Sequence, residues 1–316
     1  MILLNHAHFF KLGIEAVDKG DYETALLMFQ KAIELKSDFI PAYINLGKVY
    51  REKDEFDYAI TVFQKIISME QDVAEAYCNL GKIYHAKGNY DDSILNFKKA
   101  IQEQPDYAEA YNFMGIVYFD NADYETALTM YNKALLYDII NADIYFNTAA
   151  TYHAKGDLNN AIEMYQKTIA LDPVYAKAYD KLASAYFAQS DFAAAKEMFA
   201  KAADVYTELG NIYYDKGNFD HAITLYKKSI ELDPKHSDTF NNLGAAYFMK
   251  SDYDPAIAMY KKTLDLNPND AEALFYIGLA YNIKGDKSAE IRYIKKSASL
   301  DYPDAKLWLE EKGYSS

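Results

Sequence analysis

Residues 45–50 read Asn-Leu-Gly-Lys-Val-Tyr, and close copies follow at residues 79–84 (Asn-Leu-Gly-Lys-Ile-Tyr) and 242–247 (Asn-Leu-Gly-Ala-Ala-Tyr). The first two copies begin 34 residues apart. A fixed period of this length indicates small structural units that bury their apolar faces only by stacking on their neighbours. The sequence therefore predicts a solenoid. Its nine units lie at residues 6–39, 40–73, 74–107, 108–141, 142–175, 176–202, 203–236, 237–270 and 271–304.

The spacing inside each unit predicts two helices. In the third unit, Tyr77, Leu80 and Tyr84 are three and four residues apart, which places them on one face of a first helix, helix A. Phe97 and Ala100 do the same on a second helix, helix B. Most of the 31 tyrosines occupy such periodic positions, which predicts a structural role for them. A small residue lets helix A lie close to helix B, and it recurs as Gly13, Gly47, Gly81, Gly115 and Gly244.

The third unit shows the full pattern, in the order Tyr77, Leu80, Gly81, Tyr84, Gly88, Tyr90, Phe97, Ala100 and Pro105. This pattern resembles the tetratricopeptide repeat family, over almost all of the chain and in about nine repeats. Ser93 departs from the pattern, because alanine is usual at that position. The resemblance implies an all-α, right-handed superhelix of stacked antiparallel helix pairs. It also implies a concave groove, lined by the A helices, that receives extended peptides or helices of partner proteins.

Composition excludes several other classes of protein. A net charge of −14 argues against a nucleic-acid partner, because binding to phosphates depends on concentrated lysine and arginine. No apolar run approaches the length of a membrane span. The single cysteine, Cys78, leaves no intramolecular disulfide and suits a reducing compartment. The start of the sequence is a poor signal peptide, so we expect a cytoplasmic protein without a membrane or nucleic-acid partner.

The sixth unit lacks seven residues. Helix B of the other units ends in a segment such as residues 231–236, which turns the chain into the next helix A, and the sixth unit has no equivalent. Seven residues are about two helical turns, so the apolar face stays in phase across the deletion. Spacings of three, four, three and four join Phe199, Ala202, Tyr206, Leu209 and Tyr213. We therefore predict one continuous helix over residues 192–215, about 36 Å long.

This fused helix predicts how the chain is divided. Residues 1–202 would form a stack of six units, and residues 203–316 a stack of three units closed by a capping helix at 304–313. Leu307, Trp308 and Glu311 are expected to cover the last exposed face. Each stack would present an apolar face at the junction, and a second chain could cover both in a helix-exchanged homodimer. The alternatives are a monomer whose helix bends near Asp204 and a segment lost from the sequence.

Polar and aromatic side chains of the A helices are the candidates for binding a partner. Asparagine amides both donate and accept, which suits the backbone of an extended peptide, and four basic side chains suit a carboxylate or an acidic segment. The predicted groove comprises Asn45, Lys48, Arg51, Asn79, Lys82, His85, Asn112, Phe113, Phe146, Asn147 and Asn242. The alternatives are ordinary solvated asparagines and lysines, and aromatic rings that pack between neighbouring A helices.

Nothing in the sequence indicates catalysis. A catalytic site needs a nucleophile, a base and an orienting group in one pocket, and no such set stands out. No histidine pair has metal-ligand spacing within a helix, and no glycine loop suits a phosphate. We therefore expect a scaffold or adaptor without catalytic activity, metal or cofactor, which binds peptide segments of other proteins. The alternative function is a self-assembling structural protein that forms a homodimer.

Overall fold

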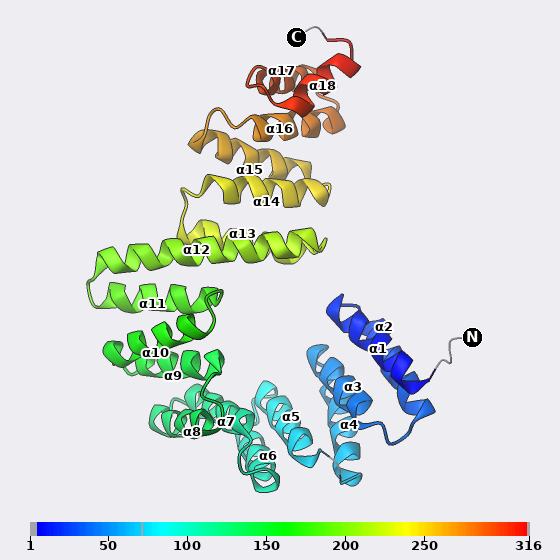
Figure 1. The fold of residues 1–316 in the computed structure, drawn as a ribbon, viewed down its shortest axis with the longest axis vertical. Coiled ribbons are helices and arrows are strands. Elements are labelled where there is room, and N and C mark those ends of the chain that lie inside the picture. The colour runs from blue at the N-terminus through cyan, green and yellow to red at the C-terminus, as the bar shows by residue number, and fades with distance from the viewer. Residues whose placement is uncertain (1–4, 71, 315–316) are drawn as a thin grey trace. The chain divides into compact units, whose positions relative to one another are not determined.

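The computed structural model describes residues 5–70 and 72–314, and in these ranges it contains α-helices and no strand (Figure 1). Contacts divide the chain into two compact units, residues 1–164 and 165–316, and the division falls within α10 (Leu158–Leu171). The division at residue 202, inferred from the missing segment, stays a prediction.

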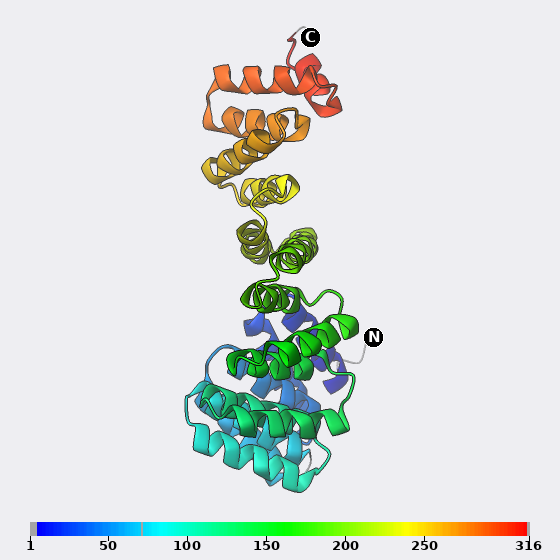
Figure 2. The same ribbon diagram turned by 90° about the vertical axis from the view of Figure 1, so that its left-hand side faces the viewer.

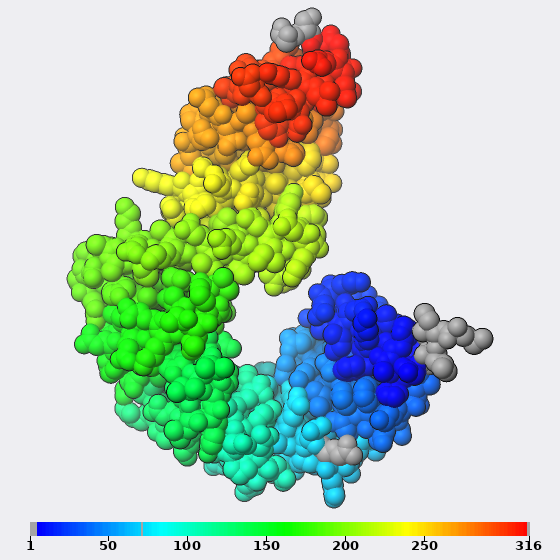
Figure 3. Space-filling model, in the orientation of Figure 1, coloured from blue at the N-terminus to red at the C-terminus, as the bar shows by residue number. Residues whose placement is uncertain are grey.

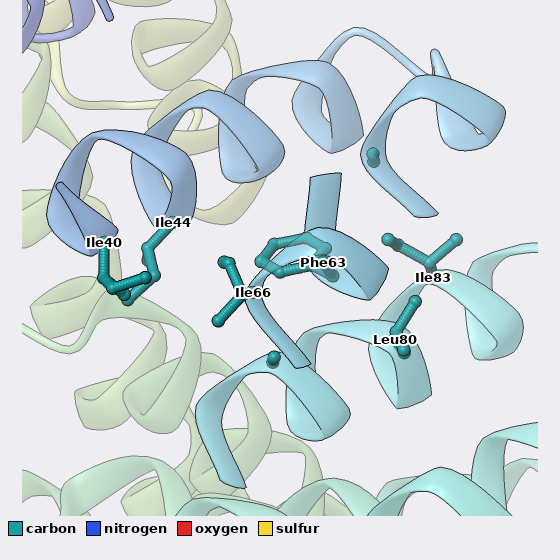
Figure 4. Packing of buried hydrophobic residues seen from close by; sticks show 8 residues of the cluster. Ile40, Ile44, Phe63, Ile66, Leu80 and Ile83 are labelled. Carbon is teal, nitrogen blue, oxygen red and sulfur yellow. The ribbon is translucent and has the colours of Figure 1, made fainter. Parts of the chain in front are cut away.

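Unit one consists of antiparallel helix pairs. Its helices are α1 (His6–Asp18), α2 (Tyr22–Leu35), α3 (Ile40–Glu52), α4 (Phe56–Ser68), α5 (Val73–Ala86), α6 (Tyr90–Glu103), α7 (Ala108–Asp120), α8 (Tyr124–Tyr137) and α9 (Ala142–Ala154). Each helix A packs on the helix B that follows it, and that helix B packs on the next helix A. The core is therefore a row of small clusters. One of them joins Ile40 and Ile44 of α3, Phe63 and Ile66 of α4, and Leu80 and Ile83 of α5 (Figure 4).

Unit two also consists of helix pairs that pack in this way, except that one long helix, α12 (Phe192–Asp215), belongs to two pairs. Its helices after α10 are α11 (Ala176–Ala188), α12 (Phe192–Asp215), α13 (Phe219–Leu232), α14 (Ser237–Met249), α15 (Tyr253–Leu266), α16 (Ala271–Lys284), α17 (Lys287–Ala298) and α18 (Pro303–Glu311). Figure 2 shows the stacked pairs from α14 to α17.

The glycine of helix A sets how closely the two helices of a pair approach. A Cβ atom at Gly81 would lie 2.6 Å from a ring carbon of Phe97, and one at Gly115 would lie 2.5 Å from the ring of Tyr131. Real Cβ atoms do not approach this closely, so only glycine allows this contact without rearrangement. The predicted close packing of the paired helices is confirmed.

The predicted fused helix is also confirmed. α12 runs for 24 residues, and Asp191 starts it by accepting a hydrogen bond from the backbone N–H of Ala194 at 3.0 Å. α11 packs near the start of α12, where the rings of Phe187 and Phe192 meet edge to face at 5.2 Å. α13 packs on the second half, where the hydroxyls of Thr207 and Ser229 lie 2.8 Å apart. One helix thus serves as helix B for α11 and as helix A for α13 (Figure 1).

The end of unit two is covered by α18, but by a different face than expected. Ala305 and Leu309 are the residues that pack against Phe275 and Ile294, whereas Leu307 is exposed. Trp308 lies at the margin of this cluster and stacks on Tyr314, and Glu311 faces solvent. The expectation that Leu307 and Glu311 cover this face is wrong, because α18 begins at Pro303 and presents the i, i+4 pair Ala305 and Leu309. Figure 3 shows these C-terminal residues in red.

Candidate functional site

The four predicted basic side chains lie along α3 and α5, and each reaches an acidic or amide group. The ammonium of Lys48 lies 2.8 Å from the carboxylate of Glu75, and that of Lys82 lies 2.6 Å from Glu109. In both pairs the lysine belongs to one helix A and the glutamate to the next. The lysine charges are therefore largely balanced within unit one.

Arg51 and His85 continue the same pattern. One guanidinium nitrogen of Arg51 donates to Oδ1 of Asn79 at 2.9 Å, and the other lies 2.7 Å from Glu52. Nε2 of His85 lies 2.6 Å from Oδ2 of Asp120 in α7. The structure thus brings the predicted basic residues together as a row of cross-helix pairs from α3 to α7.

The predicted asparagines bind one another or the backbone. Asn79 is buried, and its Nδ2 donates to the backbone carbonyl of Glu75 at 2.9 Å. Nδ2 of Asn147 donates to Oδ1 of Asn112 at 3.0 Å, which links α9 to α7. Nδ2 of Asn45 donates to the carbonyl of Pro41 at 2.8 Å. The Asn147–Asn112 bond therefore links two A helices, whereas the bonds of Asn79 and Asn45 stay within their own helices. Any role toward a peptide rests on the remaining acceptor and donor positions.

Unit one has a cavity of about 460 Å³ between α7 and α9. Asn112, Phe113 and Asn147 line it together with acidic side chains such as Glu109 and Asp143. Phe146 is not among its lining residues. The cavity therefore unites three of the predicted groove residues in an acidic setting. The ammonium of Lys82 lies 4.2 Å from the ring centroid of Phe113 beside it, a cation–π contact.

A second cavity, of about 440 Å³, lies in unit two. It is lined by Asn211, Tyr214 and Asp215 of α12, Tyr226 of α13, Asn241, Asn242, Ala245, Phe248 and Met249 of α14, Tyr260 of α15, and Glu272 and Tyr276 of α16. Three polar side chains form its network: Oδ1 of Asn211 accepts from the Tyr226 hydroxyl at 2.8 Å and from Nδ2 of Asn242 at 2.9 Å. Asn242 is the predicted groove residue in this cavity.

Two polar atoms of this second cavity lack a partner. Throughout the described ranges, Oδ1 of Asn241 and the hydroxyl of Tyr260 are the buried side-chain nitrogen or oxygen atoms without a hydrogen bond. Nδ2 of Asn241 donates to Glu272 at 3.3 Å, so its orphan oxygen is the acceptor end of the amide. The Tyr260 side chain is fully buried, and its ring stacks on Tyr276 at 5.7 Å. The residues that line this cavity thus hold one donor and one acceptor without a protein partner, both of them buried.

The second cavity is also acidic and aromatic. Burial raises the pKa of Tyr276, and the nearby carboxylate of Glu272 raises it further. The pKa of Tyr214 is raised by burial, by Tyr276 and then by Asp215. These phenols therefore remain protonated donors near neutral pH, in a field that favours positive charge.

Sequence reasoning missed most of this second cavity. Tyr260 occupies the aromatic position of helix B at which other repeats have Phe63 or Phe97, so it is a core residue as predicted. The hydroxyl of Tyr260 could have indicated this site from the sequence, because a buried phenol needs a hydrogen-bond partner. Tyr226 at the same position has Asn211 as its partner, and Tyr260 has none.

The predicted junction residues are partly covered by the chain itself. Ala202 and Tyr206 are buried, Phe199 and Leu209 are half-buried, and Tyr213 stacks on His221 at 5.3 Å. Two residues of this set are therefore buried, two are half-buried, and Tyr213 contacts α13.

Other kinds of site lack support in the described part of the chain. There, no group of three or more histidine, cysteine, aspartate or glutamate side chains could hold a metal ion. Burial raises the pKa of the Cys78 thiol to about 12, so it is not an activated nucleophile. No helix within residues 5–70 and 72–314 has the length and apolar character needed to cross a membrane.

Models of known protein families match repeats along most of the chain. A family model described as TPR repeat matches residues 15–54, 47–88, 81–122, 149–190 and 210–251. Models described as tetratricopeptide repeat match residues 108–138, 176–209 and 237–270. Among curated proteins, none matches this sequence.

Several solved structures are similar. The monomeric mutant of IFIT1 with Gppp-AAAA is 15% identical, with a TM-score of 0.52, and the match covers 93% of this chain and 71% of that one. A tetratricopeptide repeat protein from Parabacteroides merdae is 18% identical, with a TM-score of 0.49, over 76% of this chain and 98% of that one. MamA is 25% identical, with a TM-score of 0.36, over 63% of this chain and 94% of that one. The likeness to IFIT1 supports the all-α repeat fold.

Proposed function

Because the chain belongs to the tetratricopeptide repeat family, we propose that it is a non-catalytic scaffold that binds peptide segments of partner proteins along its A helices. Cavities lined by A-helix residues in each unit support this function. The acidic surroundings of both favour a basic or neutral segment over an acidic one.

The observation that carries the proposal is the pair of unpartnered atoms in unit two. A buried polar group without a hydrogen bond costs roughly 1–3 kcal/mol. A peptide backbone has both missing partners, because its carbonyl accepts from the Tyr260 hydroxyl and its N–H donates to Oδ1 of Asn241. An extended segment in this cavity would therefore relieve two unfavourable groups at once.

The walls of the cavity favour a positively charged side chain on that segment. Asp215 and Glu272 supply negative charge, and Tyr214, Phe248 and Tyr276 supply aromatic rings. Aromatic rings beside carboxylates attract ammonium and guanidinium groups through both cation–π and ionic contacts. We therefore expect a peptide with arginine or lysine to bind best.

Fluorescently labelled decapeptide pools of mixed sequence, with arginine, lysine or glutamate fixed at the centre, test this site by anisotropy. The arginine and lysine pools should bind more tightly than the glutamate pool. Tyr260→Phe should weaken binding by about three- to tenfold, the range of one hydrogen bond. Glu272→Gln should reduce the preference for the cationic pools.

Tyr131→Phe is the matched control, because Tyr131 occupies in the fourth repeat, within unit one, the position that Tyr260 occupies in its own repeat. It should leave binding by unit two unchanged. Equal binding of the three pools, or equal binding by wild type and Tyr260→Phe, would overturn the proposed site.

A second candidate function, self-association, is favoured by one observation on α12. Ile212 is 48% exposed. The residues at the same position in other repeats, such as Ile83 and Val117, are no more than 1% exposed. An isoleucine exposed at a core position indicates a surface that another protein covers. Sedimentation equilibrium of the full chain tests this function, which requires a species of twice 36.1 kDa.

A further inference from the structure

The regular junctions of the chain show how one repeat meets the next. Leu26 of α2 packs in one cluster with Leu46 and Val49 of α3, the next helix A. Ile257 of α15 packs likewise with Ile277 of α16. At each of these junctions the two helices run antiparallel, because a short turn joins them. The contact is therefore a fixed pairing between one position of helix B and two positions of the following helix A.

The junction inside α12 cannot make this contact. Lys196 occupies the repeat position of Leu26, and Leu209 and Ile212 occupy those of Leu46 and Val49. All three belong to one continuous helix, so the first half cannot fold back on the second. Leu209 is only half-buried and Ile212 is half exposed, whereas Leu46 and Val49 are buried. The second half of α12 thus lacks the helix B that every later helix A has.

The first half of α12 lacks the complementary helix. Phe199 occupies the aromatic position at which Phe63 and Phe97 are fully buried, yet it is only half-buried. It lines an open groove of about 310 Å³ with Phe187 and Phe192, whose side chains are about 60% exposed. The first half of α12, which would normally receive the next helix A, forms most of this groove, and Leu232 and Asp233 at the end of α13 border it.

We propose that two copies of the chain associate through antiparallel α12 helices, so that Leu209 and Ile212 of each copy pack on the Phe199 groove of the other. This inference rests on the second candidate function, self-association, and specifies its surface. One antiparallel pair of α12 helices creates the missing contact twice, once at each end, as a two-fold interface requires. The repeat register places Lys196 opposite Ile212, so the two-fold axis passes near Asp204, midway between them.

Charge supports the antiparallel direction. In residues 192–203, Lys201 pairs with Glu197 at 2.7 Å, which leaves the positive charge of Lys196. Residues 204–215 carry Asp204, Glu208 and Asp215. An antiparallel pair places the positive half of one helix against the negative half of the other, and a parallel pair would place like charges together. Lys196 stands where the other eight repeats have isoleucine or leucine. Its apolar stem covers the groove, and its ammonium can reach Glu208 of the second copy.

The first test is the mass of the full chain by light scattering and sedimentation equilibrium. Wild type should be a dimer at tens of micromolar. Ile212→Lys should be a monomer of unchanged helical content, because the side chain is exposed within one copy and would face Lys196 of the second copy in the dimer. Leu136→Glu is the matched control, since Leu136 is an exposed apolar residue on α8, away from α12, and this variant should stay dimeric.

The second test restores the missing turn. Insertion of Ile-Glu-Leu-Asp-Pro-Lys-His, the sequence of residues 230–236, after Ala202 should let the two halves of α12 pair within one chain. This insertion variant should be a folded monomer. A charge swap adds specificity: Lys196→Glu and Glu208→Lys should each weaken the dimer by roughly threefold, and the double variant should recover the loss.

The outcomes separate the two proposals. A wild-type monomer at 100 μM would overturn both the interface and self-association. A dimer that persists in both Ile212→Lys and the insertion variant would overturn this interface and leave self-association through another surface.

Discussion

At the scale of single residues, glycine and its facing aromatic ring determine how closely paired helices approach. The ring of Phe97 occupies the space that any side chain at position 81 would need. The fifth and sixth repeats have Ala149 and Ala183 at the equivalent position, so the two helices of each of these repeats cannot pack through a glycine. The glycine is thus a local packing requirement of particular units and is not obligatory for the fold.

Gly81→Ala should therefore destabilise unit one by about 1–3 kcal/mol, the usual cost of overpacking a core. Urea unfolding followed by circular dichroism measures the change in the free energy of unfolding. Phe97→Leu removes part of the ring that clashes, so the double variant should lose less stability than the two single variants together. A loss below 0.5 kcal/mol for Gly81→Ala would contradict the close contact.

At the scale of elements, cross-helix ion pairs couple α3 to α5 and α5 to α7. Glu109 of α7 is the clearest case. Burial alone would raise the pKa of its carboxyl, but Lys82, the hydroxyl of Tyr107 and Lys48 together outweigh burial and hold the pKa below its ordinary value. A carboxyl with a depressed pKa in the folded state stabilises that state above its unfolded pKa, and the benefit is lost as the pH falls through the folded pKa.

The free energy of unfolding of unit one should therefore fall as the pH is lowered from 6 to below 4, partly through Glu109. Glu109→Gln should be less stable than wild type at pH 6 and should show a shallower decline with acid. Urea unfolding at each pH provides the comparison. The same slope in both proteins would show that Glu109 contributes nothing to the pH dependence.

At the scale of the whole molecule, one cysteine serves as a reporter of unfolding. Cys78 is buried in α5, and burial raises the pKa of its thiol to about 12. The thiolate is the reactive form, so the folded chain should resist iodoacetamide at pH 8. Alkylation followed by mass spectrometry should rise only when urea opens this part of unit one. Rapid labelling of the native chain would show that α5 opens locally without global unfolding.

The sequence predicted most of the fold and little of the site, for a physical reason. Helical period, turn positions and the continuous α12 depend on residues within about ten positions of each other, so they can be followed along the chain. The partners of a site residue come from the next repeat. Lys48 and Lys82 suggested a positive pocket, yet their glutamates lie 27 residues further on. The orphan hydroxyl of Tyr260 depends on the absence of a neighbour, which no local pattern records.

The long helix α12 has a consequence for how the array folds. In most repeat proteins a flexible turn separates successive repeats, so one can unfold while its neighbour holds, and stability is a sum of repeat and interface contributions. Here the sixth and seventh repeats share one hydrogen-bonded rod, in which melting one half exposes a costly new helix end in the other. These two repeats should therefore unfold as a single cooperative step.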